Sequence, residues 1–504
     1  MRDLDGLTHA GAGWAGLRVV VAGLGVSGFA AADALLQRGA RVVVVDERSP
    51  TDPAHGEAIR RDAELVDVLG GTTILGPGST AALPPVGGVQ PDLVITSPGW
   101  RPDAPMLVAA SAAGTDVWGE VELAWRLREQ AGAPPWLTVT GTNGKTTTVK
   151  MLESMLRASG RRALAVGNVG TPLLHAVVDP LGYDVLAVEL SSFQLHWSRS
   201  LRPQASACLN LAPDHLDWHG SLQRYAAAKA KVYANTETAC VYDVGDPATE
   251  QMVRDADVVD GARAVGVTRG VPGPSMLGVV DDVLCDRAFL AERQHTAVEL
   301  ATMQDLRHVG GGVVARHTVT NALTAAALAR AHGVSTLAVR DGLWGLVPEP
   351  HRIATVTTAQ GVRWVDDSKA TNPHAAAASL QAFESVVWVA GGLAKGASYD
   401  DLVRQHVDRL RAVVLIGADR SLLLQALRRH APDVPVLEVE AAETGRMSPA
   451  ETVMTRAVEA AAGLARPGDV VLLAPASASM DQFVSYAHRG EAFAAAVRAR
   501  CGQG

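Results

Sequence analysis

The residues with the clearest chemistry follow an apolar run that begins at Leu137. The segment Gly141-Thr142-Asn143-Gly144-Lys145-Thr146-Thr147 is a glycine loop that opens a helix. Such a loop directs backbone N–H groups at phosphate oxygens, while a lysine reaches the terminal phosphates and a hydroxyl binds Mg²⁺. The spacing departs from the usual pattern, which would place the first glycine at position 139, where valine stands. A plain glycine turn is the alternative, but the segment favours a nucleotide triphosphate site.

Acidic and imidazole side chains follow two further predicted strands. Glu189 ends the apolar segment 184–189, and Asp214, His215 and Asp217 follow the apolar segment 205–211. The carboxyl end of a parallel strand is where a metal ligand would lie beside a nucleotide, although Glu189 could also be an edge-strand residue. Since no cysteine joins this group, it suits Mg²⁺ or phosphate better than zinc.

A second glycine loop lies near the N-terminus, between two apolar segments. Gly23, Gly25 and Gly28 form a G-x-G-x-x-G pattern after a predicted strand at 17–22, and a predicted helix at 29–38 leads to a strand at 41–46. This is a Rossmann-type opening, with Asp46 placed to accept a hydrogen bond from a ribose hydroxyl. Alone it would indicate NAD, but the same crevice can hold any nucleotide diphosphate.

Polar loops also follow the strands predicted in the last third of the chain. Asp367, Lys369 and Thr371 follow the segment 363–366, Lys395 follows 386–390, and Ser479 and Tyr486 follow 469–474. Upstream, Asn321 opens an alanine-rich helix, where its amide could read the edge of an adenine ring. Strands that alternate with helices and end in polar loops again predict a Rossmann-like sheet.

These elements predict an α/β protein of three domains, in which two Rossmann-like sheets flank a central phosphate-loop ATPase domain. The expected boundaries are 1–128, 129–348 and 349–504, with linkers near 130–135 and 347–350. Residues 243–316 read as irregular, with glycine, proline and acidic stretches. They are expected to form a surface excursion.

Composition narrows the class of protein. The formal net charge is −8 and no basic run is present, so a nucleic-acid partner is not expected. No apolar run approaches the roughly 18 residues that span a bilayer, and no apolar signal segment stands at the start, so a cytoplasmic protein without membrane insertion is expected. Only six of the 45 basic residues are lysine, at positions 145, 150, 229, 231, 369 and 395. Each lysine therefore raises the question of what a compact amine does there that a guanidinium cannot.

Several of these motifs occur together in the order of a known family. The segments 141–147, 189–195, 210–217, 317–321, His351-Arg352, 367–372 and 479–483 resemble the Mur ligase family over about residues 17–495. The loop Asp367-Ser-Lys-Ala-Thr-Asn372 indicates the subtype, since sister ligases and folylpolyglutamate synthases carry a histidine-centred motif there. Residues 243–316 and the first sixteen residues are not covered by the resemblance.

The resemblance implies an ATP-dependent amide ligase of peptidoglycan precursor synthesis. ATP would phosphorylate the terminal carboxylate of UDP-N-acetylmuramoyl-L-alanine, and the amine of D-glutamate would then attack the acyl phosphate. The implied partners are these small molecules, and the implied protein is a monomer. A dehydrogenase would be supported only by the loop at Gly23–Gly28, and an inactive nucleotide-binding module would leave the acidic and basic side chains unexplained.

The resemblance also implies roles for individual residues. Lys145, Glu189, His215 and Lys229 would be catalytic, and two Mg²⁺ ions would be held by Thr146, Glu189, His215 and a carbamate formed on Lys229 from CO₂. An ordinary Lys229 ammonium paired with phosphate is the alternative. ATP would be bound by Gly141, Thr142, Asn143, Gly144, Lys145, Thr146, Thr147, Asn321, His351, Arg352 and Asp367. The other two substrates would be bound by Gly23, Gly25, Ser27, Gly28, Asp46, Arg48, Asn168, Ser192, Lys369, Thr371, Lys395, Ser479 and Tyr486, with UDP replacing NAD at the first glycine loop.

Overall fold

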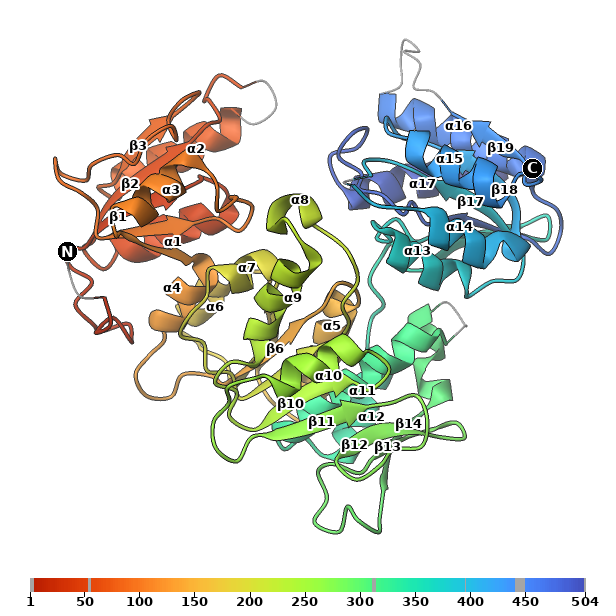
Figure 1. Ribbon diagram of the computed structural model, residues 1–504, viewed down its shortest axis with the longest axis horizontal. Coiled ribbons are helices and arrows are strands. Elements are labelled where there is room, and N and C mark those ends of the chain that lie inside the picture. Colours follow the sequence, from red (N-terminus) through yellow and green to blue (C-terminus); the bar gives the residue numbers. More distant parts are fainter. Residues whose placement is uncertain (1–3, 53–55, 311–313, 395, 440–448, 503–504) are drawn as a thin grey trace.

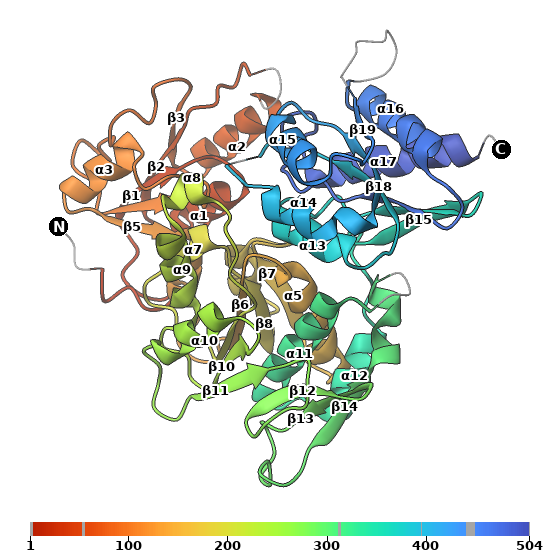
Figure 2. The ribbon, with the colours of Figure 1, turned by 45° about the vertical axis from the view of Figure 1, so that its right-hand side comes forward.

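The computed structural model contains three β-sheets, each in its own body of the chain, and it describes residues 4–52, 56–310, 314–394, 396–439 and 449–502. Figures 1 and 2 show the first body in red and orange, the central body in yellow and green, and the last in blue. In both views the central body lies below the other two, so it can contact each of them. Mixed strands and helices in this arrangement match the predicted α/β architecture.

The first sheet is parallel and has the strand order β3-β2-β1-β4-β5. Its central strands are buried runs of valine, leucine and isoleucine, as expected where helices cover both faces. The elements are β1 Arg18–Ala22, α1 Val26–Leu36, β2 Arg41–Asp46, α2 Gly56–Val68, β3 Thr72–Leu75, β4 Leu93–Thr96, α3 Pro105–Ala112, β5 Asp116–Gly119 and α4 Glu120–Arg126.

The central sheet has nine strands in the order β14-β13-β12-β11-β10-β9-β6-β8-β7. The strands are β6 Trp136–Thr140, β7 Ala163–Gly167, β8 Val185–Glu189, β9 Ala205–Cys208, β10 Ala239–Asp243, β11 Arg263–Val267, β12 Met276–Val280, β13 Val283–Asp286 and β14 Val298–Thr302. The helices are α5 Lys145–Ala158, α6 Leu173–Val177, α7 Ser192–His196, α8 Leu216–His219, α9 Leu222–Ala230, η1 Lys231–Tyr233, α10 Pro247–Arg254, η2 Met303–Gly310, α11 Arg316–Ala331 and α12 Thr336–Trp344.

The expectation of an irregular excursion at 243–316 was wrong. Four strands of this region, β11 to β14, extend the central sheet, and β12, β13 and β14 pair antiparallel as a meander. Gly266 and Gly278 lie within β11 and β12, and the residues Leu277, Val279 and Leu284 are buried in the core. Short meander strands give a weak sequence pattern because turn residues separate them after only four or five positions.

The last sheet has the order β15-β16-β20-β17-β18-β19, with β15 antiparallel at one edge. Its strands are β15 Ala354–Ala359, β16 Val362–Asp366, β17 Val386–Ala390, β18 Leu410–Leu415, β19 Val436–Glu438 and β20 Val470–Leu473. Its helices are α13 Pro373–Leu380, α14 Asp400–His406, η3 Val407–Arg409, α15 Ser421–His430, α16 Pro449–Leu464 and α17 Tyr486–Cys501.

The first two bodies share a hydrophobic core, which also includes the N-terminal residues that the family resemblance left uncovered. Leu4, Leu7 and Trp14 are buried in the same cluster as residues of both the first and the central body. The Arg126 guanidinium donates to the carbonyls of Leu4 and Leu7 at 3.2 and 3.3 Å, which ties this segment to α4. Helix α4 therefore lies at a packed junction rather than in a free linker.

In the part of the chain that the structure describes, no helix is both long enough and apolar enough to cross a bilayer.

The helix that carries the phosphate-type loop is fixed by a close contact with α12. A Cβ added to Gly342 would lie 2.4 Å from Met155 Cα and 2.6 Å from its nitrogen, and Ser154 Oγ donates to the Gly342 carbonyl at 2.6 Å. A backbone neighbour cannot rotate away, so only glycine permits this approach of α12 to α5.

We predict that Gly342→Ala lowers the free energy of unfolding by about 3 kcal/mol, because the added methyl group overpacks against the α5 backbone. Gly463→Ala in α16 is the matched control, since a Cβ there meets nothing within 4 Å. This second change should raise the free energy of unfolding by about 0.5–1 kcal/mol through helix propensity. Denaturant unfolding of both variants measures the contrast, and equal effects would contradict the close-contact explanation.

Candidate active site

The loop between β6 and α5 needs both of its glycines. Gly141 has φ +148° and Gly144 has φ +85°, in the region that favours glycine. A Cβ at Gly141 would lie 2.9 Å from Leu209 Cβ, and a Cβ at Gly144 would lie 2.5 Å from Asn321 Oδ1. The loop is therefore packed between the end of β9 and the first turns of α11, and Asn321 lies directly beside it.

Asn210 holds this loop in shape, a role that the sequence did not assign to it. Its side-chain oxygen accepts from Asn143 N at 2.9 Å, its amide donates to the Asn143 carbonyl at 3.1 Å, and its own carbonyl accepts from Thr142 N at 3.1 Å. Asn210 follows β9, which pairs with β6. Its position within the motif 210–217 is a signal that could have found it, but spacing alone does not distinguish a loop-shaping amide from a ligand-binding one.

Two lysine amines meet at one carbonyl of the loop. Lys145 Nζ donates to the Gly141 carbonyl at 2.9 Å and to that of Thr142 at 3.0 Å, and Lys229 Nζ donates to the same Gly141 carbonyl at 2.8 Å. Lys229 is only 1% exposed. Burial, followed by repulsion from Lys145, lowers the pKa of Lys229 to about 7. Burial also lowers the pKa of Lys145, against the opposing attraction of Glu189 and Asp214.

Glu189 has one carboxylate oxygen in use and one buried without a partner. Its Oε1 accepts from Asn168 Nδ2 at 2.9 Å, while Oε2 has no hydrogen-bond partner in the described structure. An unsatisfied buried carboxylate oxygen is costly, and a cation would satisfy it. This orphaned oxygen fits a Mg²⁺ ligand, as the sequence predicted for Glu189.

The other predicted metal ligands are placed around the loop without forming a complete cage. Thr146 is buried in the first turn of α5, and His215 begins α8 with a left-handed φ of +53° and with Nε2 3.7 Å from Asp214 Oδ2. Among the described residues, no three His, Cys, Asp or Glu side chains are grouped as a metal site. The residues thus fit a Mg²⁺ ion that draws further ligands from phosphate oxygens and water, which is usual for this ion.

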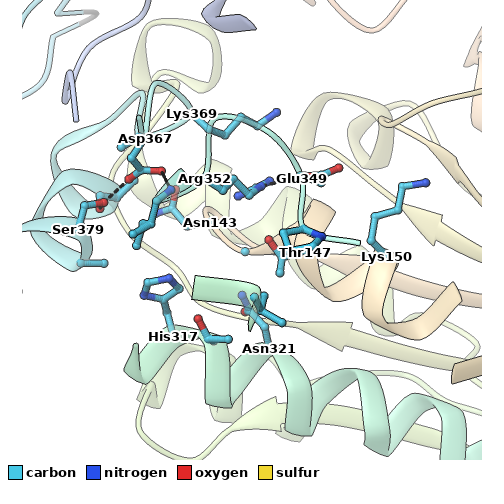
Figure 3. A pocket seen from close by; sticks show the side chains of 18 of the residues that line it. Asn143, Thr147, Lys150, His317, Asn321, Glu349, Arg352, Asp367, Lys369 and Ser379 are labelled. Carbon is cyan, nitrogen blue, oxygen red and sulfur yellow. Dashed lines mark hydrogen bonds and ion pairs between the residues drawn. The ribbon is translucent and has the colours of Figure 1, made fainter. Parts of the chain in front are cut away.

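A pocket between the central and C-terminal bodies brings predicted residues from both together (Figure 3). It has about 1020 Å³ of empty space, part of it open to solvent. Its lining includes Asn143, Gly144, Thr147, Asn321, Arg352, Asp367 and Lys369, all of them predicted site residues. The nucleotide loop and the polar loop after β16, more than 200 positions apart in the sequence, thus form one site.

Asp367 is buried at the C-terminal wall of this pocket. Its Oδ1 accepts from Ile353 N at 3.2 Å and its Oδ2 accepts from the Ser379 hydroxyl, which Figure 3 shows beside it. Burial raises the pKa of Asp367 to about 7, although Ser379 and Arg352 oppose this shift. The carboxyl group is thus fixed by neighbours and faces a pocket where a ribose hydroxyl could donate to it.

His351 does not line this pocket, although the sequence placed it with ATP. Its backbone has a left-handed φ of +63°, and its Nδ1 lies 2.6 Å from Asp366 Oδ2. Helix α17 passes so close that a Cβ on Gly490 would lie 2.2 Å from His351 Nδ1. His351 therefore holds the start of the C-terminal body together instead of facing the nucleotide side.

A second group of predicted residues lies at the carboxyl ends of β16 and β20. The Lys369 ammonium lies 3.8 Å from the ring centroid of Tyr486, a cation–π distance, and Thr371 N donates to the Lys369 carbonyl at 2.8 Å. Ser479 is buried in the loop after β20. Lys395 lies outside the described residues.

Arg489 joins these two loops and was not predicted from the sequence. It is 1% exposed, and its guanidinium donates to the Ser368 hydroxyl at 3.0 Å, the Ser368 carbonyl at 2.9 Å and the Ser477 carbonyl at 3.2 Å. Burial lowers its pKa to about 10. An arginine on an alanine-rich helix gives no sequence signal, because solvated arginines have the same pattern.

The Asp46 carboxylate holds the N-terminal glycine loop in shape. A Cβ on Gly28 would lie 1.8 Å from the Gly23 carbonyl oxygen, so α1 crosses the loop closely. Asp46 Oδ2 accepts from Leu24 N at 2.7 Å and from Arg48 Nη2 at 2.6 Å, and Oδ1 accepts from Arg48 N and Nε, both at 2.9 Å. The carboxylate is therefore occupied by the loop and by Arg48, which the expectation of a free ribose acceptor did not foresee.

Two further predicted substrate residues are also engaged. The Ser192 hydroxyl lies 3.0 Å from His219 Nε2, in a cluster of rings that includes Phe193. Burial raises the pKa of Glu120, and the nearby Ser27 hydroxyl opposes this shift. Both therefore support neighbouring elements. Gly25, at the N-terminus of α1, lies near Arg48, because a Cβ there would be 4.0 Å from Arg48 Nη2.

Comparison with family models gives three matches along the chain. Residues 17–119 match the model described as Mur ligase MurD-like, N-terminal domain, residues 139–329 match the Mur ligase middle domain, and residues 351–477 match the Mur ligase, glutamate ligase domain. Each match covers all or nearly all of one of the three sheets.

Full-length relatives and solved structures agree with these matches. Proteins named UDP-N-acetylmuramoylalanine--D-glutamate ligase from Streptomyces coelicolor and Thermobifida fusca are each 55% identical, covering 96% and 97% of this chain and 98% and 99% of the relatives. A structure of UDP-N-acetylmuramate-alanine ligase from Thermotoga maritima has a TM-score of 0.53 at 18% identity, with 96% of this chain and all of that chain covered. A MurF ligase from the same organism, solved in complex with ADP, also has a TM-score of 0.53 at 18% identity, covering 99% of this chain and 100% of that one. These structures support the fold.

Burial of the Lys229 amine makes stability depend on pH. An unfolded lysine has a pKa near 10.5, whereas the folded value is about 7. Between these values the unfolded state binds the proton and the folded state does not, so stability rises with pH. Below pH 7 both states are protonated, and the contribution is then constant.

We predict that, in CO₂-free buffer, the free energy of unfolding of the native protein rises by roughly 2 kcal/mol relative to Lys229→Met between pH 7 and pH 9. Denaturant unfolding at both pH values gives this difference. Lys231→Met is the control and should show a smaller rise, because the Lys231 side chain is exposed and its ammonium donates to the His196 carbonyl at 2.7 Å, although partial burial lowers its pKa in the same direction. A pH-independent difference for Lys229→Met would contradict the shifted titration.

Proposed function

The chain belongs to the Mur ligase family, and from that membership we propose that it joins D-glutamate to UDP-N-acetylmuramoyl-L-alanine at the expense of ATP. The observation that carries the proposal is full-length identity of 55% to relatives that bear the name of this ligase. The pocket that unites the Gly141–Thr147 loop with the Asp367–Asn372 loop supports it. The reaction belongs to peptidoglycan precursor synthesis, a process that places the enzyme and its small-molecule substrates in the cytoplasm. We propose that it works as a monomer.

ATP is bound in the pocket between the central and C-terminal bodies. Backbone N–H groups at Gly144 and the start of α5 face the phosphates, and the Lys145 ammonium leaves its loop carbonyls to bind the terminal phosphates. Asn321, beside Gly144, contacts the base, and Asp367 accepts from the ribose. Arg352, held by Glu349 at 2.8 Å, adds a positive charge to this wall of the pocket.

Mg²⁺ bound beside the phosphate loop would supply positive charge where the substrate carboxylate meets the γ-phosphate. We propose that Thr146, Glu189, His215 and a carbamate on Lys229 hold two such ions, together with phosphate oxygens. Glu189 brings its unpartnered Oε2 to this role, and Asn168 orients the carboxylate through Oε1. Burial and the hydrogen bond from Asn168 thus fix the Glu189 carboxylate in position.

The chemistry has two steps. A carboxylate oxygen of the substrate attacks the γ-phosphorus, and the bond to the β-phosphate oxygen breaks to release ADP. The amine of D-glutamate then forms the new C–N bond, inorganic phosphate leaves with the electrons of the C–O bond, and the nitrogen loses a proton. Lys369, Thr371, Ser479, Tyr486 and Lys395 hold the D-glutamate carboxylates, with Arg489 fixing the loops that carry Lys369 and Ser479.

The UDP end of the substrate is held by the first body. The loop from Gly23 to Gly28 approaches the diphosphate through backbone N–H groups at the start of α1, and Arg48 supplies positive charge near Gly25. Asn168 then contacts the muramoyl part beside Glu189. The substrate thus extends from the first body to the central one.

The surroundings of Lys229 support the proposal of a carbamate. Its amine is buried beside a second amine and lies 4.6 Å from the ring centroid of Tyr225, with no ion-pair partner among the described residues. An amine that is neutral for part of the time can capture CO₂, and the carbamate converts a repelling cation into an anion that binds a metal.

We predict that phosphate release requires ATP, UDP-N-acetylmuramoyl-L-alanine and D-glutamate together, since the amine completes the reaction. With ATP and the UDP substrate alone, hydroxylamine should trap the acyl phosphate as a hydroxamate. A coupled assay for ADP and a colorimetric assay for the hydroxamate check both steps. Equal stimulation by L-glutamate or meso-diaminopimelate, without a hydroxamate, would refute the assignment.

We predict that Lys229→Arg abolishes activity although it keeps the positive charge, because a guanidinium cannot form the carbamate. Lys229→Ala should regain part of its activity when a small carboxylate such as acetate is added. Lys231→Arg is the matched control on the neighbouring turn and should stay near the native rate. Near-native turnover by Lys229→Arg would return Lys229 to the role of a plain cation.

A further inference from the structure

Glu120 begins α4 and lies buried where the first body meets the central one. It is 2% exposed, and its Oε1 accepts from Leu174 N at 3.2 Å. Leu173 N–H and the Ser27 hydroxyl lie close enough to this carboxylate to oppose the rise in its pKa that burial causes. A single side chain therefore connects three separate segments of the chain.

Two of these segments lead directly to the substrate-binding loops. Ser27 stands in the first turn of α1, two residues after Gly25 of the N-terminal glycine loop. Leu173 and Leu174 begin α6, which follows the 167–172 turn that carries Asn168. Asn168 in turn bonds to Glu189 at 2.9 Å. Glu120 thus lies between the loop for the UDP end of the substrate and the turn beside the reacting end.

Burial raises the pKa of the Glu120 carboxyl group, but every neighbour that donates to it favours the charged form. Helix α6 has no side-chain cap of its own, and its first N–H groups would be unsatisfied in the core without Glu120. The N-termini of α1 and α6 both favour a negative charge at this point. A neutral amide at position 120 could still accept hydrogen bonds, but its NH₂ group would face donors on one side.

We propose that Glu120 is a positioning residue for the UDP-linked substrate. Its side chain sets the separation between the glycine loop of the first body and the Asn168 turn of the central body. The inference rests on the proposed function, because only a substrate that binds to both loops is sensitive to their separation. A ligand confined to the first loop is not. This difference separates positioning from simple stabilisation.

Helix α4 contains a matched control. Glu122 is also fully buried, and its carboxylate accepts from Arg126 Nε at 2.7 Å, Arg199 N at 2.8 Å and Ser200 N at 3.0 Å. These partners lie in neither substrate loop. Glu122→Gln therefore disturbs the same junction to a similar extent without touching the connection between Ser27 and α6.

The test is calorimetric titration of the full-length protein with UDP and with UDP-N-acetylmuramoyl-L-alanine. Glu120→Gln should weaken binding of the complete substrate by about tenfold and leave the affinity for UDP nearly unchanged. Ser27→Ala, which removes only the hydroxyl at the UDP side, should weaken the complete substrate in the same direction, and the double variant should add little. Glu122→Gln should bind both ligands as the native protein does.

Equal loss of affinity for UDP and for the complete substrate would overturn the inference, since the effect would then lie within the glycine loop. Unchanged affinity for both would overturn it as well. Additive losses in the double variant would show that Ser27 and Glu120 act separately, which also contradicts it. Failure of the proposed function would look different, because the native protein would then not bind UDP-N-acetylmuramoyl-L-alanine better than UDP.

Discussion

The Gly141 carbonyl accepts hydrogen bonds from the amines of both Lys145 and Lys229. Two like charges cannot share a buried oxygen without cost, so one amine must be neutral or an anion must join them. An anion bound at one of the amines would meet this need, and the proposed phosphate and carbamate groups are both anions. The glycines, Asn210 and the packing of α5 against α12 all hold this carbonyl in place.

The three bodies are joined in two different ways. The first and central bodies share a continuous apolar core around α4, whereas the central and C-terminal bodies meet across a pocket whose lining includes charged side chains. A shared core resists relative motion, while a partly open pocket leaves room for a ligand at the interface. The junction at α4 is therefore the more rigid of the two.

Sequence reasoning recovered the features that repeat a local pattern and missed those that depend on tertiary contacts. The phosphate-type loop, the strand that ends at Glu189 and the family followed from apolar runs and motif order. Strands β11 to β14 were missed because short meander strands carry little periodicity. His351 was placed with ATP by its motif, but its left-handed backbone turns the ring to Asp366. Asn210 and Arg489 contribute through contacts with distant segments, and no spacing rule reports such contacts.

The segment from Leu4 to Trp14 has a practical consequence. Because its apolar side chains are buried and its carbonyls accept from Arg126, it is part of the junction that holds α4. Fusion partners or affinity tags attached close to this end would lie beside the packed junction between the first and central bodies. The opposite end of the chain, beyond α17, is the better place for an attachment, since α17 forms its contacts with the C-terminal sheet and α16.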